Sequence, residues 1–411
     1  MIRSLTIGLP LDGMSTAEIE SRVRRLLRDA ANVLGEASVS ARTFRFTLPA
    51  CGMDGEDEGA LLSRLRWTDE LACATGVRWF CLPLDFVAPG PRRGRIAAAL
   101  DAVGRFERLF LNLMVAGRRR IAVDAVNDAS RLILDLSRKS SNGFDNFRVG
   151  ASFNCPANAP FFPFSRHEGA NVAFSLALET TSLACEAVRA CGKPQDADVV
   201  RDCLVEALIP ALRSMDIIGE RLATVSGSEY RGLDASLAPL PADGASVAAL
   251  VQQIIGAPLG SHASVFATAF LTDAIRTAIT ASGVKPLGFN GVMYSVLEDT
   301  VLAASVSQRH ISFDGLLALS TVCACGLDMI PVPGLSFPEE ISAVMLDVGA
   351  ISCALDKPLG VRLLPIPNGC VNEFTRLNLD FLCDSRILGL TSNDRRFGSA
   401  EHLVGFRSHR H

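Results

Sequence analysis

Apolar residues recur along the first part of the chain with two different spacings, which predicts strands and helices in alternation. The short apolar run 5–10 predicts a buried strand, and apolar positions spaced as on one face of a helix follow over 16–34. Ser15 stands just before that helix as a candidate N-cap. A second strand is predicted over 41–48, where apolar and polar residues alternate. The chain therefore begins with a β-α-β unit.

The same alternation continues to about residue 154. Helices are predicted near 61–75, 95–106 and 123–136, and strands over 77–84, 109–115 and 148–154. Strands that alternate with helices pair mainly in parallel, so their carboxyl ends lie along one edge of the sheet. We expect a ligand at that edge, where α/β proteins commonly bind theirs.

The second part of the chain is predicted to be mainly helical, with a few strands. Prolines and phenylalanines over 155–163 cannot form a regular element and predict a loop that is tightly packed or lines a pocket. One strand is expected over 232–239, and helices are expected over 171–190, 197–223, 247–255, 264–282 and 293–307. The segment 320–367 combines an apolar run, a helix over 339–355 and a strand around 361–364, and we expect the site to be organised around it.

Length and composition describe a folded globular protein. The chain has 411 residues, of which 49% are hydrophobic and 20% charged, and we expect one α/β domain over 1–390 with a polar tail over 391–411. A net charge of -4 gives no electrostatic argument for a nucleic-acid partner. Neither a signal peptide nor an uninterrupted apolar span of membrane length is visible, which predicts a cytoplasmic protein that does not bind a membrane. The expected partner is a small molecule.

The 12 cysteines are scattered and form no C-x-x-C pair, so most are expected to be buried apolar residues. Cys323, Cys325 and Asp328 follow a helix-like run over 313–322. Cys323 is the candidate nucleophile or hydrogen-bond donor, with Asp328 close by. The alternative is that both cysteines are buried in a tight joint between a helix and a strand.

Carboxylates near the ends of predicted elements supply candidates for acid–base catalysis. Asp234 lies in a strand among small neighbours, where burial of a carboxylate requires a partner or a ligand, and it is the best candidate general base. A salt bridge to an arginine is the alternative. Ser236 lies two residues further on. Glu298 and Asp299 are adjacent, so on a helix only one of them can face a site.

Arginine and histidine side chains supply candidates for binding an anion. Arg166 beside His167, and Arg362 in its predicted strand, can clamp a carboxylate or phosphate with the guanidinium fork. His262 stands at a predicted helix N-terminus, where it either contacts an anion or belongs to an ordinary capping region. The complete set of candidate ligand-binding residues is Arg166, His167, His262, Arg362, Asn146 and Ser236.

The sequence offers no motif for a metal or a cofactor. No H-x-x-x-H or H-E-x-x-H spacing is present, and neither glycine-rich nucleotide fingerprint occurs. We therefore predict no cofactor and no metal, although a carboxylate-rich Mg²⁺ site stays an alternative.

Four segments in fixed order carry a family resemblance. They are GLDASLAP over 232–239, GVMYSVLED over 291–299, VCACGLDMIPVPG over 322–334 and DKPLGVRLLPIP over 356–367, and GFDNF over 143–147 and FFP over 161–163 agree with them. With these segments the chain resembles the uncharacterised "PFL family protein" group up to about Leu390. The group's barrel is similar to that of pyruvate formate-lyase and other glycyl-radical enzymes.

The resemblance implies an α/β barrel of about ten strands, a pocket inside it, and a homodimer. It does not imply radical chemistry, because the tail over 395–400 lacks the glycine loop that holds the radical in those enzymes. The chain also departs from its relatives after Pro367, where NGCVNE replaces a turn that usually contains lysine and aspartate.

Two hypotheses of function follow. The first is a non-radical enzyme that acts on a small polar or anionic metabolite by hydrolase, lyase or isomerase chemistry. Asp234 or Glu298 would be its acid or base, Cys323 its nucleophile or hydrogen-bond donor, and Arg166 or Arg362 its anion clamp. The second is a small-molecule-binding or regulatory protein without turnover.

Overall fold

The structure is a computed structural model, and it describes residues 1–11, 13–52, 58–88, 92–117, 119–140, 142–192, 196–391 and 403–406. Its strands are β1 Ile2–Gly8, β2 Ala41–Thr47, β3 Trp79–Asp85, β4 Leu109–Gly117, β5 Arg120–Ala122, β6 Val149–Phe153, β7 Ala173–Leu178, β8 Glu229–Asp234, β9 Gly326–Pro333, β10 Leu359–Ile366 and β11 Leu403–Gly405. Its α-helices are α1 Thr16–Glu36, α2 Glu58–Thr75, α3 Arg92–Arg105, α4 Val123–Ser137, α5 Thr181–Ala190, α6 Ala197–Ser226, α7 Val247–Ile255, α8 Ser264–Ser282, α9 Thr300–Ser307, α10 Phe313–Leu319 and α11 Pro338–Leu355.

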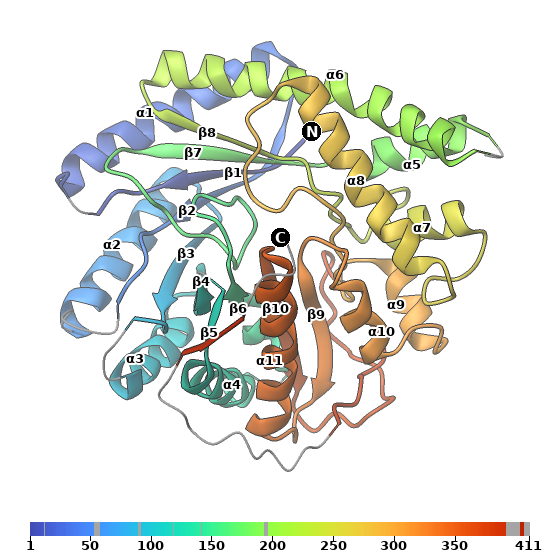
Figure 1. The fold of residues 1–411 in the computed structure, drawn as a ribbon. Helices are drawn as coiled ribbons and strands as arrows, with labels where there is room; N and C mark the ends of the chain where they lie inside the picture. Colours follow the sequence, from blue (N-terminus) through green and yellow to red (C-terminus); the bar gives the residue numbers. More distant parts are fainter. Residues whose placement is uncertain are drawn as a thin grey trace.

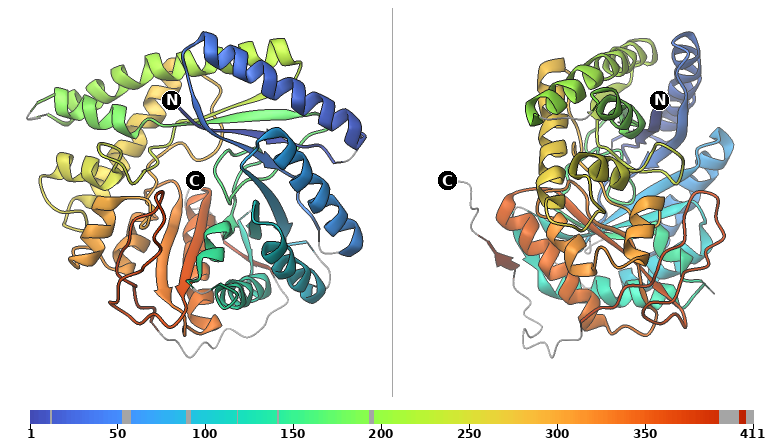
Figure 2. Two further views of the ribbon diagram at one scale, coloured as in Figure 1. Left: turned by 180° about the vertical axis from the view of Figure 1, so that it is seen from behind. Right: turned by 90° about the vertical axis from the view of Figure 1, so that its right-hand side faces the viewer.

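One large, mostly parallel sheet organises the molecule. Its strands follow the order β8-β7-β1-β2-β3-β4-β6-β10-β9, with β5 paired to β4 and β11 paired to β5. Every neighbouring pair in that order is parallel except β7 with β1 and β6 with β10. The sheet curls, and the helices lie around its outer side (Figures 1 and 2).

The two edges of the sheet approach each other through a connecting segment. Residues 286–296 form isolated bridges to β9 and to the β8 side, at Ser295 with Asp328, at Leu237 with Val292 and at Leu233 with Pro286. Among the described residues these bridges replace a continuous hydrogen-bonded ladder between β8 and β9. The predicted α/β fold with a mostly parallel sheet is confirmed, whereas a closed barrel of ten strands is not.

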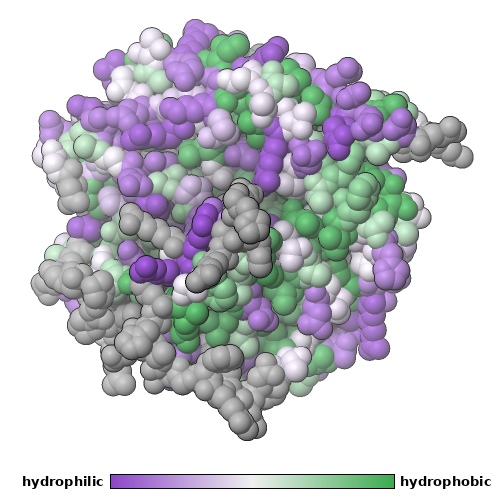
Figure 3. Space-filling model, in the orientation of Figure 1, coloured by the Kyte–Doolittle hydropathy of each residue, from purple (hydrophilic) through white to green (hydrophobic). Residues whose placement is uncertain are grey.

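The first helix shows how the sequence sets the layers. Ser15 accepts a hydrogen bond from the Glu18 N–H, and Glu18 reaches back to Ser15, which confirms the predicted cap as a capping box. The buried residues of α1 recur every three or four positions, so one side of the helix packs on the sheet. Figure 3 shows mostly hydrophilic residues over the outer sides of α1 and α6. Among the described residues, no helix has both the length and the apolar character needed to span a bilayer.

A loop over 154–167, here called the inner loop, packs on the strands from the concave side of the sheet. The hydroxyls of Ser4 and Thr6 in β1 each donate to the Pro160 carbonyl at 3.2 Å. Its close approach requires glycine in the neighbouring strands. A Cβ on Gly8 would lie 2.0 Å from a ring nitrogen of His167. The proline-rich segment is therefore a packed loop, as predicted, and its phenylalanines also line a cavity.

Two predicted helices are wrong in part. The segment 171–190 contains strand β7 before helix α5, because a short apolar run is equally compatible with a buried strand. The helix predicted over 293–307 begins only at Thr300, where Asp299 caps α9 by accepting from two backbone N–H groups. Residues 293–299 are consequently extended or turn-like, and Glu298 lies outside any helix.

The predicted domain boundary near residue 390 falls at the end of the long described range. Of the polar tail predicted over 391–411, only 391 and 403–406 are described, and β11 within it pairs with β5. The segment 395–400, which lacks the radical-glycine pattern, lies outside the described residues.

Candidate functional site

Five arginine side chains line one cavity of about 120 Å³, here called the arginine pocket. They are Arg3 of β1, Arg42 and Arg45 of β2, Arg78 just before β3, and Arg362 of β10. Two carboxylates, Glu298 and Asp328, and the thiol of Cys325 share the lining. The remaining wall is largely aromatic, and includes Trp79, Phe110, Phe147, Phe162 and Phe381.

The arginine pocket lies at the amino ends of the parallel strands β1 to β4. This position differs from the carboxyl ends, where the sequence led us to expect a ligand, and that expectation stays a prediction. A second cavity of about 360 Å³ does lie at the carboxyl ends of β4 and β6, where Ala116, Ser152 and Asn154 line it. Because the inner loop fills the middle of the concave side, the two cavities are separate.

Arg45 is the pocket residue with the least compensation for its charge. It is 8% exposed, and its Nε donates to the Thr43 hydroxyl at 3.1 Å. Its guanidinium carbon lies 5.4 Å from the ring centre of Trp79 and 5.1 Å from that of Phe162. No carboxylate among the described residues forms an ion pair with it. Burial, helped by repulsion from Arg3 and Arg362, lowers the pKa of Arg45 to about 9.

Arg362 differs from Arg45 because protein groups satisfy its charge. Its Nε and Nη2 donate to the two oxygens of Asp328 at 2.6 and 2.8 Å, and Nη2 also reaches Glu298 at 3.3 Å. Glu298 accepts a further hydrogen bond from Ser295 at 2.6 Å and lies 3.9 Å from Arg3. The structure thus brings together three predicted site residues, Arg362, Asp328 and Glu298, in one charged network.

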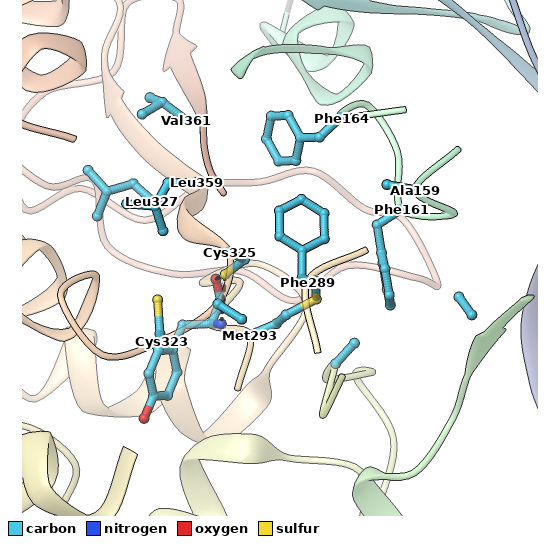
Figure 4. Close-up of a cluster of buried hydrophobic side chains, with 14 of the residues drawn as sticks. Ala159, Phe161, Phe164, Phe289, Met293, Cys323, Cys325, Leu327, Leu359 and Val361 are labelled. Atoms are coloured by element: carbon cyan, nitrogen blue, oxygen red, sulfur yellow. Dashed lines mark hydrogen bonds between the residues drawn. The ribbon is translucent and has the colours of Figure 1, made fainter. Parts of the chain in front are cut away.

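The two cysteines of the 322–334 segment have different surroundings. Cys325 lines the arginine pocket, whereas Cys323 is 1% exposed and does not. A hydrogen bond between the two thiols, together with burial, raises the pKa of Cys325. Cys325 is therefore held as a thiol, which suits a hydrogen-bond donor better than a nucleophile. Figure 4 shows both thiols beside the apolar cluster around Phe289, which also contains Phe161 and Phe164 of the inner loop.

Asp234 and Ser236 lie outside the lining of the arginine pocket. Asp234 is fully buried and accepts hydrogen bonds from the Ser236 hydroxyl at 2.5 Å and from the Phe289 N–H at 2.7 Å. The N–H groups of Ser236 and Asn290 also donate to it. Burial raises the pKa of Asp234, and these donors oppose that effect. Its placement is that of a carboxylate that fastens the segment after residue 286 to β8. Among the described residues it forms no ion pair with an arginine, and its role as a general base stays a prediction.

The remaining candidates are dispersed. Asn146 is fully buried and donates to the Ile133 carbonyl at 3.1 Å, away from the pocket. His262 is exposed just before α8. Arg166 lines the second cavity and pairs with Glu168 at 3.0 Å. The structure therefore does not bring these three residues to the arginine pocket.

His167 is 2% exposed and belongs to the packing of the inner loop. One ring nitrogen is 3.1 Å from the side-chain oxygen of Asn158. Burial, with repulsion from Arg231, lowers the pKa of His167 from 6.5 to about 4. Because the folded-state pKa lies below the ordinary value, the unfolded chain binds the extra proton between these two pH values.

We therefore expect His167 to make the protein less stable as the pH falls from 6.5 to 4. Its contribution to the free energy of unfolding is at most about 3 kcal/mol, and it is fully present above pH 6.5. Urea denaturation at several pH values would show that the free energy of unfolding falls less steeply with decreasing pH in His167→Asn than in the wild type. The exposed His262→Asn variant is the control. Equal slopes in wild type and His167→Asn would contradict the prediction.

The arginines at positions 3, 45 and 78 were absent from the sequence-based candidates. A usable signal existed for Arg45, because it lies between Phe44 and Phe46 in the second half of β2, where Arg45, Phe46 and Thr47 are all buried. Arg3 likewise lies in a strand whose residues are all buried. A charged residue inside a strand that is covered on both faces requires a partner or a ligand.

Among the described residues, no group of three or more histidine, cysteine, aspartate and glutamate side chains is placed to hold a metal ion. The acidic side chains of the arginine pocket are instead engaged by arginines.

The fold and the cavity together define a mixed α/β protein with an arginine-lined pocket at the amino ends of its parallel strands. A family model described as uncharacterised ACR (DUF711) matches residues 1–378, and the chain belongs to this family.

Curated relatives carry the name UPF0210 protein. The one from Pyrobaculum arsenaticum is 32% identical over 380 residues, which cover 89% of this chain and 82% of that protein. The one from Pyrobaculum islandicum is 30% identical, with 88% and 81% covered. The relative from Syntrophotalea carbinolica is 27% identical, with 90% and 86% covered. These matches confirm membership of an uncharacterised family, and the link to the pyruvate formate-lyase barrel stays a prediction.

Proposed function

We propose that this protein binds a small anionic metabolite in the arginine pocket. The observation that carries the proposal is Arg45, a guanidinium that is 8% exposed and has no carboxylate partner among the described residues. Burying a charge without a counter-charge costs free energy, and folded proteins usually pair such a charge with an opposite one. An anion bound beside Arg45 would supply that counter-charge.

The charge and size of the pocket support the same proposal. Its lining contains five arginines and two carboxylates, and a third carboxylate, Glu179, pairs with Arg42 from outside the lining. The pocket therefore has two more cations than anions. Its volume of about 120 Å³ is close to that of a cavity of ~150 Å³ that accepts benzene, which limits the ligand to a small metabolite.

Thermal unfolding of the protein with acetate, butyrate, succinate, citrate and phosphate at constant ionic strength tests the proposal. A ligand at ~100 times its dissociation constant stabilises the folded state by about 2.7 kcal/mol, which gives a clear rise in melting temperature. We expect at least one compound to do so, and we expect Arg45→Met to remove the rise. An absence of any rise, or an equal rise in Arg45→Met, would show that the pocket does not bind anions.

A catalytic role is the second proposal, and the position of Glu298 favours it. Among the pocket carboxylates, Glu298 has the more exposed side chain at 17%, against 14% for Asp328. Asp328 is held by two hydrogen bonds from Arg362, whereas Glu298 receives one from Arg362 and one from Ser295. Glu298 would act as the acid or base on a carbon next to a bound carboxylate, which is the chemistry of an isomerase or a lyase.

Exchange of carbon-bound hydrogen with solvent tests the catalytic role. The compound that binds most tightly is incubated with the protein in D₂O, and mass spectrometry follows deuterium incorporation. We expect Glu298→Gln to slow the exchange by roughly 10²- to 10⁴-fold while the compound still binds. Binding without exchange in the wild type would instead favour a binding or regulatory protein. A homodimer and a cytoplasmic location stay predictions.

A further inference from the structure

Two arginines of the pocket have side-chain N–H groups that no carboxylate of the described residues accepts from. These two arginines lie at different depths in the pocket. Arg45 is buried, whereas Arg78 is exposed at the rim. Among the described residues neither forms an ion pair with a carboxylate. Both therefore have N–H groups that a ligand can use, and this inference rests on the proposed binding of an anion in the arginine pocket.

The other three arginines are already engaged. Arg42 donates through two nitrogens to Glu179, at 2.5 and 3.2 Å. Arg362 is held by Asp328, Glu298 and the Phe147 carbonyl. Arg3 donates to the carbonyls of Ala238 and Pro239. They set the positive potential of the pocket but have fewer free donors than Arg45 and Arg78.

A single aromatic ring, that of Trp79, limits the distance between the guanidinium groups of Arg45 and Arg78. The guanidinium carbon of Arg78 lies 4.4 Å from the ring centre of Trp79, and that of Arg45 lies 5.4 Å from the same centre. The two carbons are consequently no more than about 10 Å apart. A guanidinium placed over a ring keeps its N–H edge available for a planar acceptor, and a carboxylate matches that edge with two hydrogen bonds.

We infer that the ligand of the arginine pocket is a small dicarboxylate that places one carboxylate on Arg45 and the other on Arg78. Two carboxylates joined by a short carbon chain, each about 2.8 Å from its guanidinium, can span the separation of the two arginines. A molecule of this kind has about the size that the cavity admits. A monocarboxylate would satisfy only one of the two arginines, and inorganic phosphate spans a shorter distance than a dicarboxylate.

Isothermal titration calorimetry of the full chain with succinate, glutarate, butyrate and inorganic phosphate tests the inference. We expect succinate or glutarate to bind at least about 10-fold more tightly than butyrate and phosphate. Arg78→Gln should lower the dicarboxylate affinity to about that of butyrate and should weaken butyrate binding much less. Because Arg78 is exposed, this variant should fold normally, and circular dichroism would check it.

Arg24→Gln, which removes an equal charge from the exposed surface of α1, is the matched control and should bind like the wild type. Equal affinities for succinate and butyrate, a preference for phosphate, or unchanged dicarboxylate binding in Arg78→Gln would overturn the dicarboxylate assignment while anion binding stands. Failure of all four compounds to bind would overturn the proposed function itself, and the dicarboxylate assignment with it.

Discussion

Arg45→Met is expected to weaken dicarboxylate binding by at least about 30-fold, because it removes a buried partner of a charged hydrogen-bonded pair. The same variant should leave the free energy of unfolding of the ligand-free protein unchanged or raise it by about 1 kcal/mol. The second effect is expected because methionine fills similar space and removes a buried charge that has no counter-charge. Calorimetry with succinate and urea denaturation of the ligand-free protein would measure the two effects.

Arg148→Met is the matched control for Arg45→Met, since both arginines are 8% exposed. Arg148, however, pairs with Asp145 at 2.5 Å and donates to the carbonyls of Phe106 and Val103. Its loss should lower the free energy of unfolding by about 3 to 5 kcal/mol. If Arg45→Met destabilised the protein as much as Arg148→Met does, Arg45 would be a structural residue, and the argument for a ligand would fail.

Arg362→Met is expected to lower the free energy of unfolding by about 3 to 5 kcal/mol. The variant would leave Asp328 and Glu298 in the wall of the pocket without the cation that holds them. Breaking a buried ion pair from one side costs more than the pair contributes, because the remaining charge stays desolvated. Urea denaturation of the wild type and the variant would measure the difference.

Arg119→Met supplies the comparison for Arg362→Met on the surface. Arg119 and Asp356 form an ion pair at 2.6 Å in which both side chains are 42% exposed. Its loss should change the free energy of unfolding by less than about 1 kcal/mol, because solvent screens exposed pairs. Similar small effects of both substitutions would mean that the network around Arg362 does not stabilise the fold.

Most elements of the first part of the chain follow from the sequence because their periodicity and caps agree. β1, α1 and β2 are examples, and Ser15 performs the capping that its position predicts. The strand β7 was missed because its apolar run is buried on both faces and shows no alternation. The start of α9 was missed because residues 293–299 have helix-compatible spacing, whereas Asp299 fixes the cap further along the chain.

A residue of the candidate site could be predicted only where its side-chain chemistry and its place in a predicted element both indicate a site. Arg362, Asp328 and Glu298 were identified from their residue types, and the pairing of β9 with β10 brings Asp328 and Arg362 together. The contacts of Asp234 with Phe289 and Asn290 could not be foreseen, because these two hydrogen-bond donors lie more than 50 residues further along the chain. Arg45 and Arg78 become neighbours through Trp79, and this contact depends on the register of β2 against β3.

A crystal structure of the protein after exposure to a mixture of cellular metabolites tests the central claim most directly. We expect density in the arginine pocket for a small molecule with two acidic groups, one of them within hydrogen-bond distance of the terminal nitrogens of Arg45. Density for water alone in that pocket would contradict the claim. So would a structure in which a carboxylate of the protein itself pairs with Arg45.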